Sequence, residues 1–258
     1  MQLIDAHAHF YNSSDYLHHL LQMMDTCGIS KCCLSGLGKI FNCKSNKDVK
    51  NAFECYPDKI IGSYFIRPGK VSPAEIEEAH SQGFKMLKVS IPTKSYDNKS
   101  FFPLWKKAEE LEMPVLFHTG IVTIAQNARN ENVSSWNMHP MRLEPIANAF
   151  PNLNLIIAHL GVHWNEDAAE LMRMRPNVYS DITGEPDGWR VRAERIGIKK
   201  WLWWEGAFKK LIFGTDVFYN KIPLILEQDK NRLQKYKIDH ETKSLFFSKN
   251  IIKLLGMD

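Results

Sequence analysis

The sequence predicts an α/β protein in which eight parallel strands close into a (β/α)8 TIM barrel. Short apolar runs alternate with longer amphipathic stretches, and eight such alternations fit within 258 residues. The apolar runs are rich in Val, Ile, Leu and Phe, which is typical of parallel strands covered by helices on their outer face. No internal repeat or Pro/Gly/Ser-rich linker interrupts the pattern, so we expect one domain over residues 1–258.

Each expected strand is followed by a stretch with helical periodicity. The expected strands begin at residues 2, 31, 60, 84, 114, 153, 177 and 209. The expected helices cover about residues 15–27, 47–55, 72–81, 103–111, 141–149 and 165–174, and further helices fill the C-terminal part. Gly28 ends the first helix, because glycine readily adopts the backbone conformation that terminates helices. The Trp-rich segment 188–207 is the least regular, and we expect it to cover the barrel near its mouth.

Composition and charge exclude several classes of function. The formal net charge of +4 comes from 33 basic and 29 acidic residues spread along the chain. This excess of basic residues is too small and too dispersed to predict a surface that binds nucleic acid. An anionic small substrate fits if basic residues gather in a pocket. No stretch approaches the ~20 apolar residues that cross a bilayer, and the N-terminus lacks the pattern of a secretory signal. The five cysteines show no CxxC pairing, so we expect reduced thiols in a cytoplasmic protein.

The segment DAHAHF places His7 and His9 two residues apart at the end of the first apolar run. Side chains at i and i+2 of a strand point to the same face, so these two imidazoles can converge. His118, His159 and Asp216 end the fifth, sixth and eighth expected strands. The carboxyl ends of parallel strands open on one face of a barrel, where such barrels carry their active sites. Any one of these residues is more often structural, but the five together predict a metal site.

The residue types indicate which metal such a site would hold. Neutral imidazoles and one carboxylate suit a borderline cation such as Zn²⁺ and leave a position for water. The cation lowers the pKa of that water, and a nearby base completes its deprotonation. Mn²⁺ and Fe²⁺ accept the same ligand types, so the ligands do not separate these three ions.

Four segments, DAHAHF, LFHTG, FPNLNLIIAHLG and LIFGTD, resemble in this order the amidohydrolase superfamily. The closer resemblance is to its amidohydrolase-related branch, which includes aminocarboxymuconate-semialdehyde decarboxylase and the resorcylate decarboxylases. It extends from the first strand to KNIIKLLG near the C-terminus. Two features depart from those decarboxylases: the chain is shorter, and DAHAH lacks the acidic residue of the EEH pattern found in resorcylate-type enzymes.

The resemblance implies a role for each residue of the site. His7, His9 and His118 match metal ligands, and Asp216 matches an aspartate that binds the metal and relays a proton from the bound water. His159 matches a histidine that, in this branch, more often holds and deprotonates the water than binds the metal. In binuclear relatives the fifth- and sixth-strand histidines hold a second ion, bridged by a carboxylated lysine of the fourth strand.

Four further residues are candidates for substrate binding. Lys88 lies near the position of the bridging lysine, and we prefer a solvated or salt-bridged lysine, or a partner for a substrate anion, over carboxylation. Arg67 ends the third strand, where it either binds a carboxylate through a bidentate pair or forms a salt bridge at the rim. Trp136 and His139 lie on the long loop after the fifth strand, which is either a lid or pocket wall or simply packed loop structure.

The sequence therefore predicts a metal-dependent hydrolase. His159 and Asp216 would be its catalytic residues, and a metal-activated water would attack an amide, lactone or ester carbonyl. The alternative is metal-dependent, non-oxidative decarboxylation of an unsaturated or aromatic carboxylic acid. A catalytically silent barrel is the third hypothesis, which the complete ligand set argues against. The expected partner is a small molecule, with a homodimer unsurprising for the family and with no nucleic acid or membrane.

Overall fold

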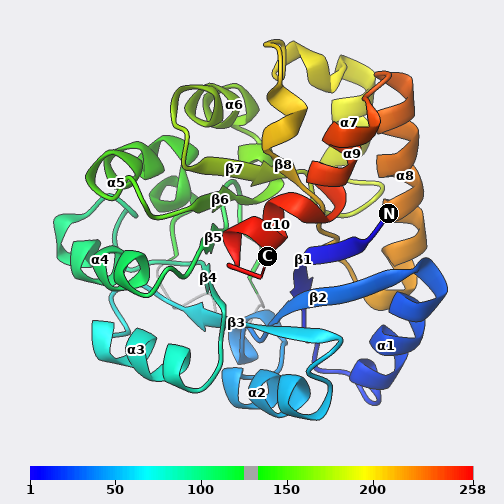
Figure 1. Ribbon diagram of the computed structural model, residues 1–258. Helices are drawn as coiled ribbons and strands as arrows, with labels where there is room; N and C mark the ends of the chain where they lie inside the picture. The colour runs from blue at the N-terminus through cyan, green and yellow to red at the C-terminus, as the bar shows by residue number, and fades with distance from the viewer. Residues whose placement is uncertain (125–132, 258) are drawn as a thin grey trace.

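The computed structural model describes residues 1–124 and 133–257 and confirms the predicted barrel. Eight parallel strands pair in the order β1 to β8, so each strand lies beside the next one along the chain (Figure 1). The strands are β1 Leu3–His9, β2 Ile29–Ser35, β3 Ile60–Ile66, β4 Met86–Val89, β5 Val115–Phe117, β6 Leu155–Ile157, β7 Val178–Asp181 and β8 Leu211–Ile212. This order is the one that a repeated strand–helix unit produces.

The α-helices surround the ring of strands, except that α10 lies across one end of it (Figure 1). They are α1 Tyr16–Cys27, α2 Asn46–Cys55, α3 Pro73–Ser81, α4 Phe102–Glu110, α5 Glu144–Ala149, α6 Asn165–Met174, α7 Trp189–Ile196, α8 Ile222–Lys235, α9 His240–Ser244 and α10 Asn250–Leu254. The predicted helix near residue 141 begins as a 3-10 turn, Pro140–Leu143, and becomes α-helical at Glu144. Among the described helices, none has the length and apolar character needed to cross a membrane.

Two apolar layers hold the barrel together. The outer layer lies between strands and helices, and the inner layer fills the ring itself. Cys32 belongs to the outer layer and Cys33 to the inner one, as expected for neighbouring residues of a strand. The side chains of Ile251 and Leu254 complete the inner layer, and α10 lies across that end of the ring (Figure 1).

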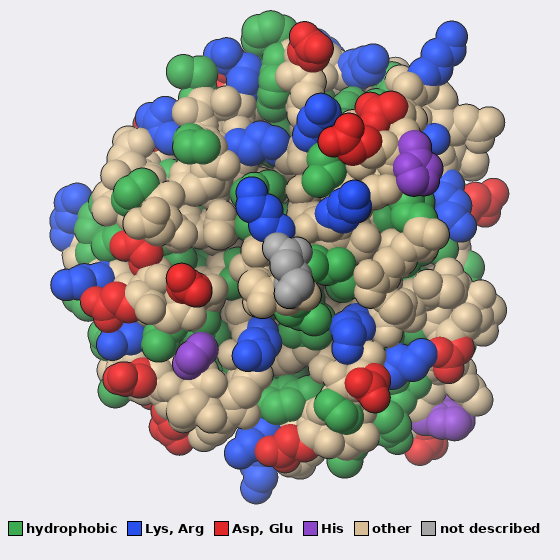
Figure 2. Space-filling model, in the orientation of Figure 1, with side chains coloured by type: hydrophobic (Ala, Val, Ile, Leu, Met, Phe, Trp, Pro, Cys, Tyr) green, Lys and Arg blue, Asp and Glu red, His purple; other side chains and the backbone are tan. Residues whose placement is uncertain are grey.

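The end covered by α10 shows no concentration of one charge. Figure 2 looks onto this end and shows basic and acidic side chains mixed across it. This distribution agrees with the small net charge of +4. Surface charge on the end covered by α10 therefore marks no candidate site.

A seam between β1 and the end of β8 brings the ring nearly to closure. Ala6 N donates to the Phe213 carbonyl over 3.0 Å. The buried Asp5 carboxylate accepts from the main-chain N–H groups of His7 and Thr215, each over 3.0 Å, and from the Thr215 hydroxyl over 2.6 Å. Burial raises the pKa of the Asp5 carboxyl to about 7, although these hydrogen bonds act to lower it. The seam thereby fixes the residues after β8 against β1.

Gly214 permits this close approach. A Cβ atom at this position would lie 2.8 Å from His7 Cβ and 2.9 Å from Thr183 Cγ2. Both neighbours are buried, so neither has open space into which it can move. A glycine is therefore required here by steric contact.

We expect Gly214→Ala to lower the free energy of unfolding by about 1–3 kcal/mol, the usual cost of overpacking a core. Urea denaturation of the variant and the wild type measures this difference. A variant as stable as the wild type would contradict the steric role of Gly214.

Candidate metal centre

The structure brings three imidazoles to one carboxylate at the carboxyl ends of the strands. Asp216 Oδ1 lies 2.8 Å from His9 Nε2 and 3.7 Å from His7 Nε2. Asp216 Oδ2 lies 3.6 Å from His159 Nε2. The ligand atoms of His7, His9 and Asp216 all lie within 4.8 Å of one another. Four of the five residues predicted from the strand ends therefore form one compact group.

His118 joins this group through His159. Its Nδ1 lies 3.2 Å from His159 Nε2. Within the described part of the chain, His118 is not a member of a three-residue set as compact as the one above. His118 Nε2 is buried and has no hydrogen-bond partner among the described residues. Its role as a ligand therefore stays a prediction.

Asp181 fixes the protonation of His7. Its Oδ2 lies 2.8 Å from His7 Nδ1, and a carboxylate can only accept, so the imidazole proton is on Nδ1 and the lone pair on Nε2. Its Oδ1 accepts from His159 N over 2.7 Å, Thr183 N over 3.0 Å and the Thr183 hydroxyl over 2.7 Å. Asp181 also forms a compact set with His7 and His159. Because its oxygens already accept from these four donors, we interpret it as a partner of the ligands. Asp181 is not among the residues predicted from the sequence, although it ends the seventh strand as the predicted residues end theirs.

Hydroxyl groups orient two further imidazoles. Thr183 Oγ1 gives its only proton to Asp181 and therefore accepts from His159 Nδ1, 2.8 Å away. Ser35 Oγ donates to a main-chain carbonyl over 3.2 Å and accepts from His9 Nδ1 over 2.8 Å. In both imidazoles the Nε2 lone pair is left on the side of Asp216. Such partners are typical of metal-binding histidines.

The charges of the group also suit a cation. Burial lowers the pKa of His7 to about 4, with the Lys88 charge adding to the effect, and burial likewise lowers the pKa of His9 and His118. Burial acts to raise the pKa of the Asp216 carboxyl, but His7 and His9 outweigh it and hold that pKa well below its usual range. Neutral imidazoles beside an ionised carboxylate are the states that a metal ion binds.

Strained backbone shapes the centre and ends two strands early. His159 and Asp216 have φ values of 59° and 52°, in the left-handed region that side-chain-bearing residues rarely adopt. Each such residue costs on the order of 1–3 kcal/mol. The bond from His159 N to Asp181 Oδ1 and a 2.8 Å bond from Asp216 N to the His7 carbonyl hold these turns. The sixth and eighth strands are therefore shorter than predicted, because the chain turns at its functional residues.

Lys88 belongs to the centre as well. Its side chain is 1% exposed, and its Nζ lies 2.8 Å from His7 Nε2. Burial lowers the pKa of Lys88 to about 8. The expectation of a solvated lysine is therefore wrong, and its role toward a substrate anion stays a prediction.

A cavity of about 520 Å³ opens beside this group. Its polar side includes His9, Lys88, His118, His159 and Asp216. Its apolar walls include Tyr11, Leu37, Phe41, Ile121, Val122, Val162 and Trp189. Trp189 confirms that the Trp-rich segment reaches the mouth of the barrel. Such a cavity has the size and mixed lining of a small-molecule site.

Three of the predicted substrate-binding residues lie elsewhere in the described structure. Arg67 Nε donates over 2.8 Å to a main-chain carbonyl of the loop after β4, and Arg67 is not among the cavity-lining residues. Trp136 and His139 pack together, and the His139 ring lies 4.5 Å from that of Trp164. Neither lines the cavity. Residues 125–132 of the predicted lid lie outside the described residues.

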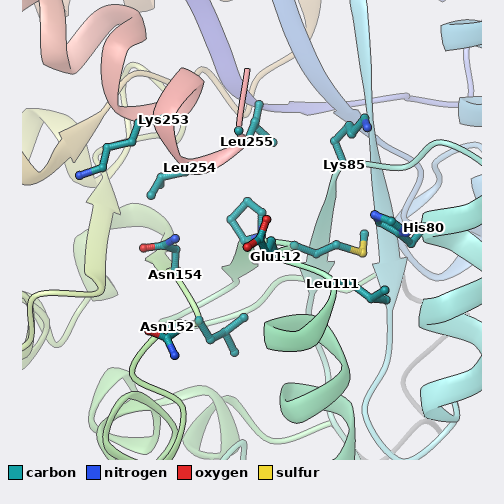
Figure 3. Close-up of a pocket in the computed structure, with 13 residues that line it drawn as sticks. His80, Lys85, Leu111, Glu112, Asn152, Asn154, Lys253, Leu254 and Leu255 are labelled. Atoms are coloured by element: carbon teal, nitrogen blue, oxygen red, sulfur yellow. The ribbon is translucent and has the colours of Figure 1, made fainter. Parts of the chain in front are cut away.

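A second cavity, of about 390 Å³, lies at the opposite end of the barrel (Figure 3). Lys85, Asn154 and Lys253 line it, and Glu112 lies near its middle in the close-up. Its charged side chains are exposed, and none of the predicted site residues reaches it. The candidate active site is therefore the cavity beside Asp216.

A parallel barrel that joins imidazoles and a carboxylate at its strand ends has the construction of a metal-dependent barrel enzyme. The family model described as Amidohydrolase matches residues 44–257, and the chain belongs to this family. No curated protein matches the chain as a relative.

Solved structures show the same fold across whole chains. An uncharacterised TIM-barrel protein from Bordetella bronchiseptica is 17% identical, with a TM-score of 0.76 and 99% of each chain covered. A probable 2-pyrone-4,6-dicarboxylic acid hydrolase from Acinetobacter baumannii, with citric acid bound, is 16% identical, with a TM-score of 0.67 over 99% of this chain and 100% of that one. A 5-carboxyvanillate decarboxylase from Novosphingobium aromaticivorans, complexed with manganese and 4-hydroxy-3-methoxy-5-nitrobenzoic acid, is 16% identical, with a TM-score of 0.66. The match covers 99% of this chain and 96% of that one.

We expect Asp181→Asn to weaken divalent-metal binding by about 10- to 100-fold, because an amide no longer fixes the His7 proton on Nδ1. Competition with a chromogenic chelator measures this affinity. Asp187→Asn, an exposed carboxylate a few residues further along, is the control and should bind as the wild type does. Equal affinity in both variants would show that Asp181 does not support the ligands.

Proposed function

We propose that the chain is a metal-dependent hydrolase that cleaves an amide, lactone or ester carbonyl in a small molecule. The observation that carries this proposal is the approach of His7, His9 and His159 Nε2 to the Asp216 carboxylate beside a cavity. Hydrogen bonds keep the proton of each imidazole on Nδ1, so the lone pairs on the Nε2 atoms face Asp216. Membership of the amidohydrolase family supports the same reading.

The residues fit one divalent cation. His7, His9, His118 and Asp216 would hold it, because neutral imidazoles and an ionised carboxylate are the donor set that such a cation binds. A bound cation supplies a Lewis acid for the carbonyl and lowers the pKa of a water. Zn²⁺ is our first choice, and the manganese in the 5-carboxyvanillate decarboxylase complex makes Mn²⁺ a serious alternative.

His159 is our proposed general base. Its Nε2 lone pair lies on the cavity side, 3.6 Å from Asp216 Oδ2, so both groups can accept a proton from a water held between them. The Thr183 hydroxyl holds the opposite nitrogen, and the Asp181 carboxylate behind it stabilises the positive charge that His159 gains. Apolar walls around this point exclude bulk water and strengthen these interactions.

Replacement of His159 with Ala should lower turnover by more than about 100-fold, the usual scale for loss of a general base. His163→Ala is the matched control, because His163 is exposed and does not line the cavity, and it should keep wild-type turnover. Initial rates on the best substrate of a lactone, ester and amide panel measure both. Full activity without His159 would rule out its assignment as the base.

Protein purified without added metal should carry about one ion per chain, as a mononuclear hydrolase site does. His7→Ala and Asp216→Ala should lose it, because each removes a ligand from the compact set. Elemental analysis by mass spectrometry gives both identity and stoichiometry. Close to two ions per chain would overturn the mononuclear site and place Lys88 among the ligands, and wild-type protein that takes up no ion would overturn the proposed function.

A second candidate function is non-oxidative decarboxylation of an unsaturated or aromatic acid. The observation in its favour is the buried Lys88 ammonium beside His7, in a cavity that Phe41 and Trp189 also line. A carboxylate placed there would meet both a cation and a flat apolar surface. Several structural neighbours are described as decarboxylases, and others as pyrone hydrolases.

One assay separates the two reactions. The panel is extended with aromatic monocarboxylic acids, and CO₂ release is followed alongside acid release in a weakly buffered indicator solution. Hydrolysis releases an acid without CO₂, whereas decarboxylation releases CO₂ without net addition of water. CO₂ as the product would replace the hydrolase proposal with the decarboxylase one.

A further inference from the structure

The segment Asp181–Thr183 carries the partners of two imidazoles, and its main chain is held from outside the site. Asp181 binds His7, and Thr183 binds His159, as described above. The carbonyl of Ile182 accepts a hydrogen bond from Arg190 Nη1. The carbonyl of Thr183 accepts one from Trp189 Nε1 over 2.8 Å. Both donors lie in the first turn of α7.

Arg190 connects this segment to α8. Its side chain is 1% exposed, its Nη2 donates to Asp229 Oδ1 over 2.6 Å, and its Nε donates to Gln228 Oε1 over 2.8 Å. The planar guanidinium thereby binds three acceptors in a fixed arrangement, which a lysine could not do. A shift of Arg190 would displace the Ile182 carbonyl and, with it, Asp181 and Thr183.

We propose that Arg190 and Trp189 are positioning residues of the metal centre. They fix the main chain of 181–183 so that Asp181 and Thr183 hold the imidazoles of His7 and His159 with their lone pairs toward Asp216. Neither residue touches the ligand atoms, so both act through that segment. The inference rests on the proposed metal-dependent function.

Arg232 provides a matched control within the same ion cluster. It is buried like Arg190, at 2% exposed, and donates to the same Asp229 carboxylate and to Glu194. It makes no described hydrogen bond to the segment 181–183. Loss of either arginine disrupts the packing of α7 on α8, but only loss of Arg190 releases the Ile182 carbonyl.

The test compares Arg190→Met and Arg232→Met with the wild type by titration of each apoprotein with Co²⁺. The d–d absorption of bound Co²⁺ reports its ligand geometry, and chelator competition gives its affinity. We expect Arg190→Met to bind Co²⁺ about 10-fold or more weakly and with an altered spectrum, in line with the effect of outer partners on metal ligands. Arg232→Met should keep the wild-type affinity and spectrum even if its melting temperature falls.

The outcomes separate this inference from the proposed function. If the wild type binds no Co²⁺, the proposed function fails and the inference fails with it. If the wild type binds and Arg190→Met has the same affinity and spectrum, the inference alone is overturned. Equal losses in both arginine variants also overturn it, because the cluster would then act only through the stability of the fold.

Trp189→Phe keeps the test decisive if Arg190→Met does not fold. It retains an aromatic ring in the cavity wall and removes only the indole N–H that binds the Thr183 carbonyl. Trp201→Phe, a half-buried tryptophan shortly after α7, is its control. A weakened and spectrally altered Co²⁺ site in Trp189→Phe alone supports the inference, and unchanged binding in both variants overturns it.

Discussion

The contact between β1 and the residues after β8 is the interaction on which the rest of the site depends. The two metal-ligand candidates on β1 and the carboxylate after β8 come from opposite parts of the sequence, and only the closing seam makes them neighbours. Asp5 binds both sides of this seam at once. The same hydrogen bonds that complete the barrel therefore assemble its reactive group.

The seam also explains why the centre tolerates strain. Asp216 turns in the left-handed region directly after the seam, and its N–H is bound to the carbonyl of His7. The hydrogen bonds of the seam offset the cost of the strained turn.

The fold could be predicted from the sequence, and so could the grouping of His7, His9 and Asp216, because both depend on local pattern. The periodicity and apolar character of the sequence identify the strands, and the carboxyl ends of the strands mark the mouth of the barrel. The position of His7, His9 and Asp216 at strand ends was therefore enough to predict that they lie together. Asp181 also ends a strand, but its importance depends on which residue it meets across the barrel, and a single sequence does not contain that information. The Arg190 link between helices was invisible for the same reason.

Arg67 and His139 show the limit of arguments from position. Arg67 does follow a strand, and its Nε donates to the main-chain carbonyl of Ile91 in the neighbouring loop, a contact that depends on the three-dimensional path of that loop. His139 lies on the expected loop, and its ring packs against that of Trp164 at a tilted angle. For both residues the strand or loop follows from the sequence, and a role toward a substrate stays a prediction.

The way α10 fills the inner layer of the barrel has a consequence for how the chain folds. Ile4 of β1 and Leu254 of α10 share one core, although nearly the whole sequence separates them. Contacts of such large sequence separation form slowly, since the entropy of a long loop must be lost first. A growing polypeptide that has not yet made α10 therefore exposes the open inner end of its ring, and this is the stage at which aggregation or chaperone binding would act.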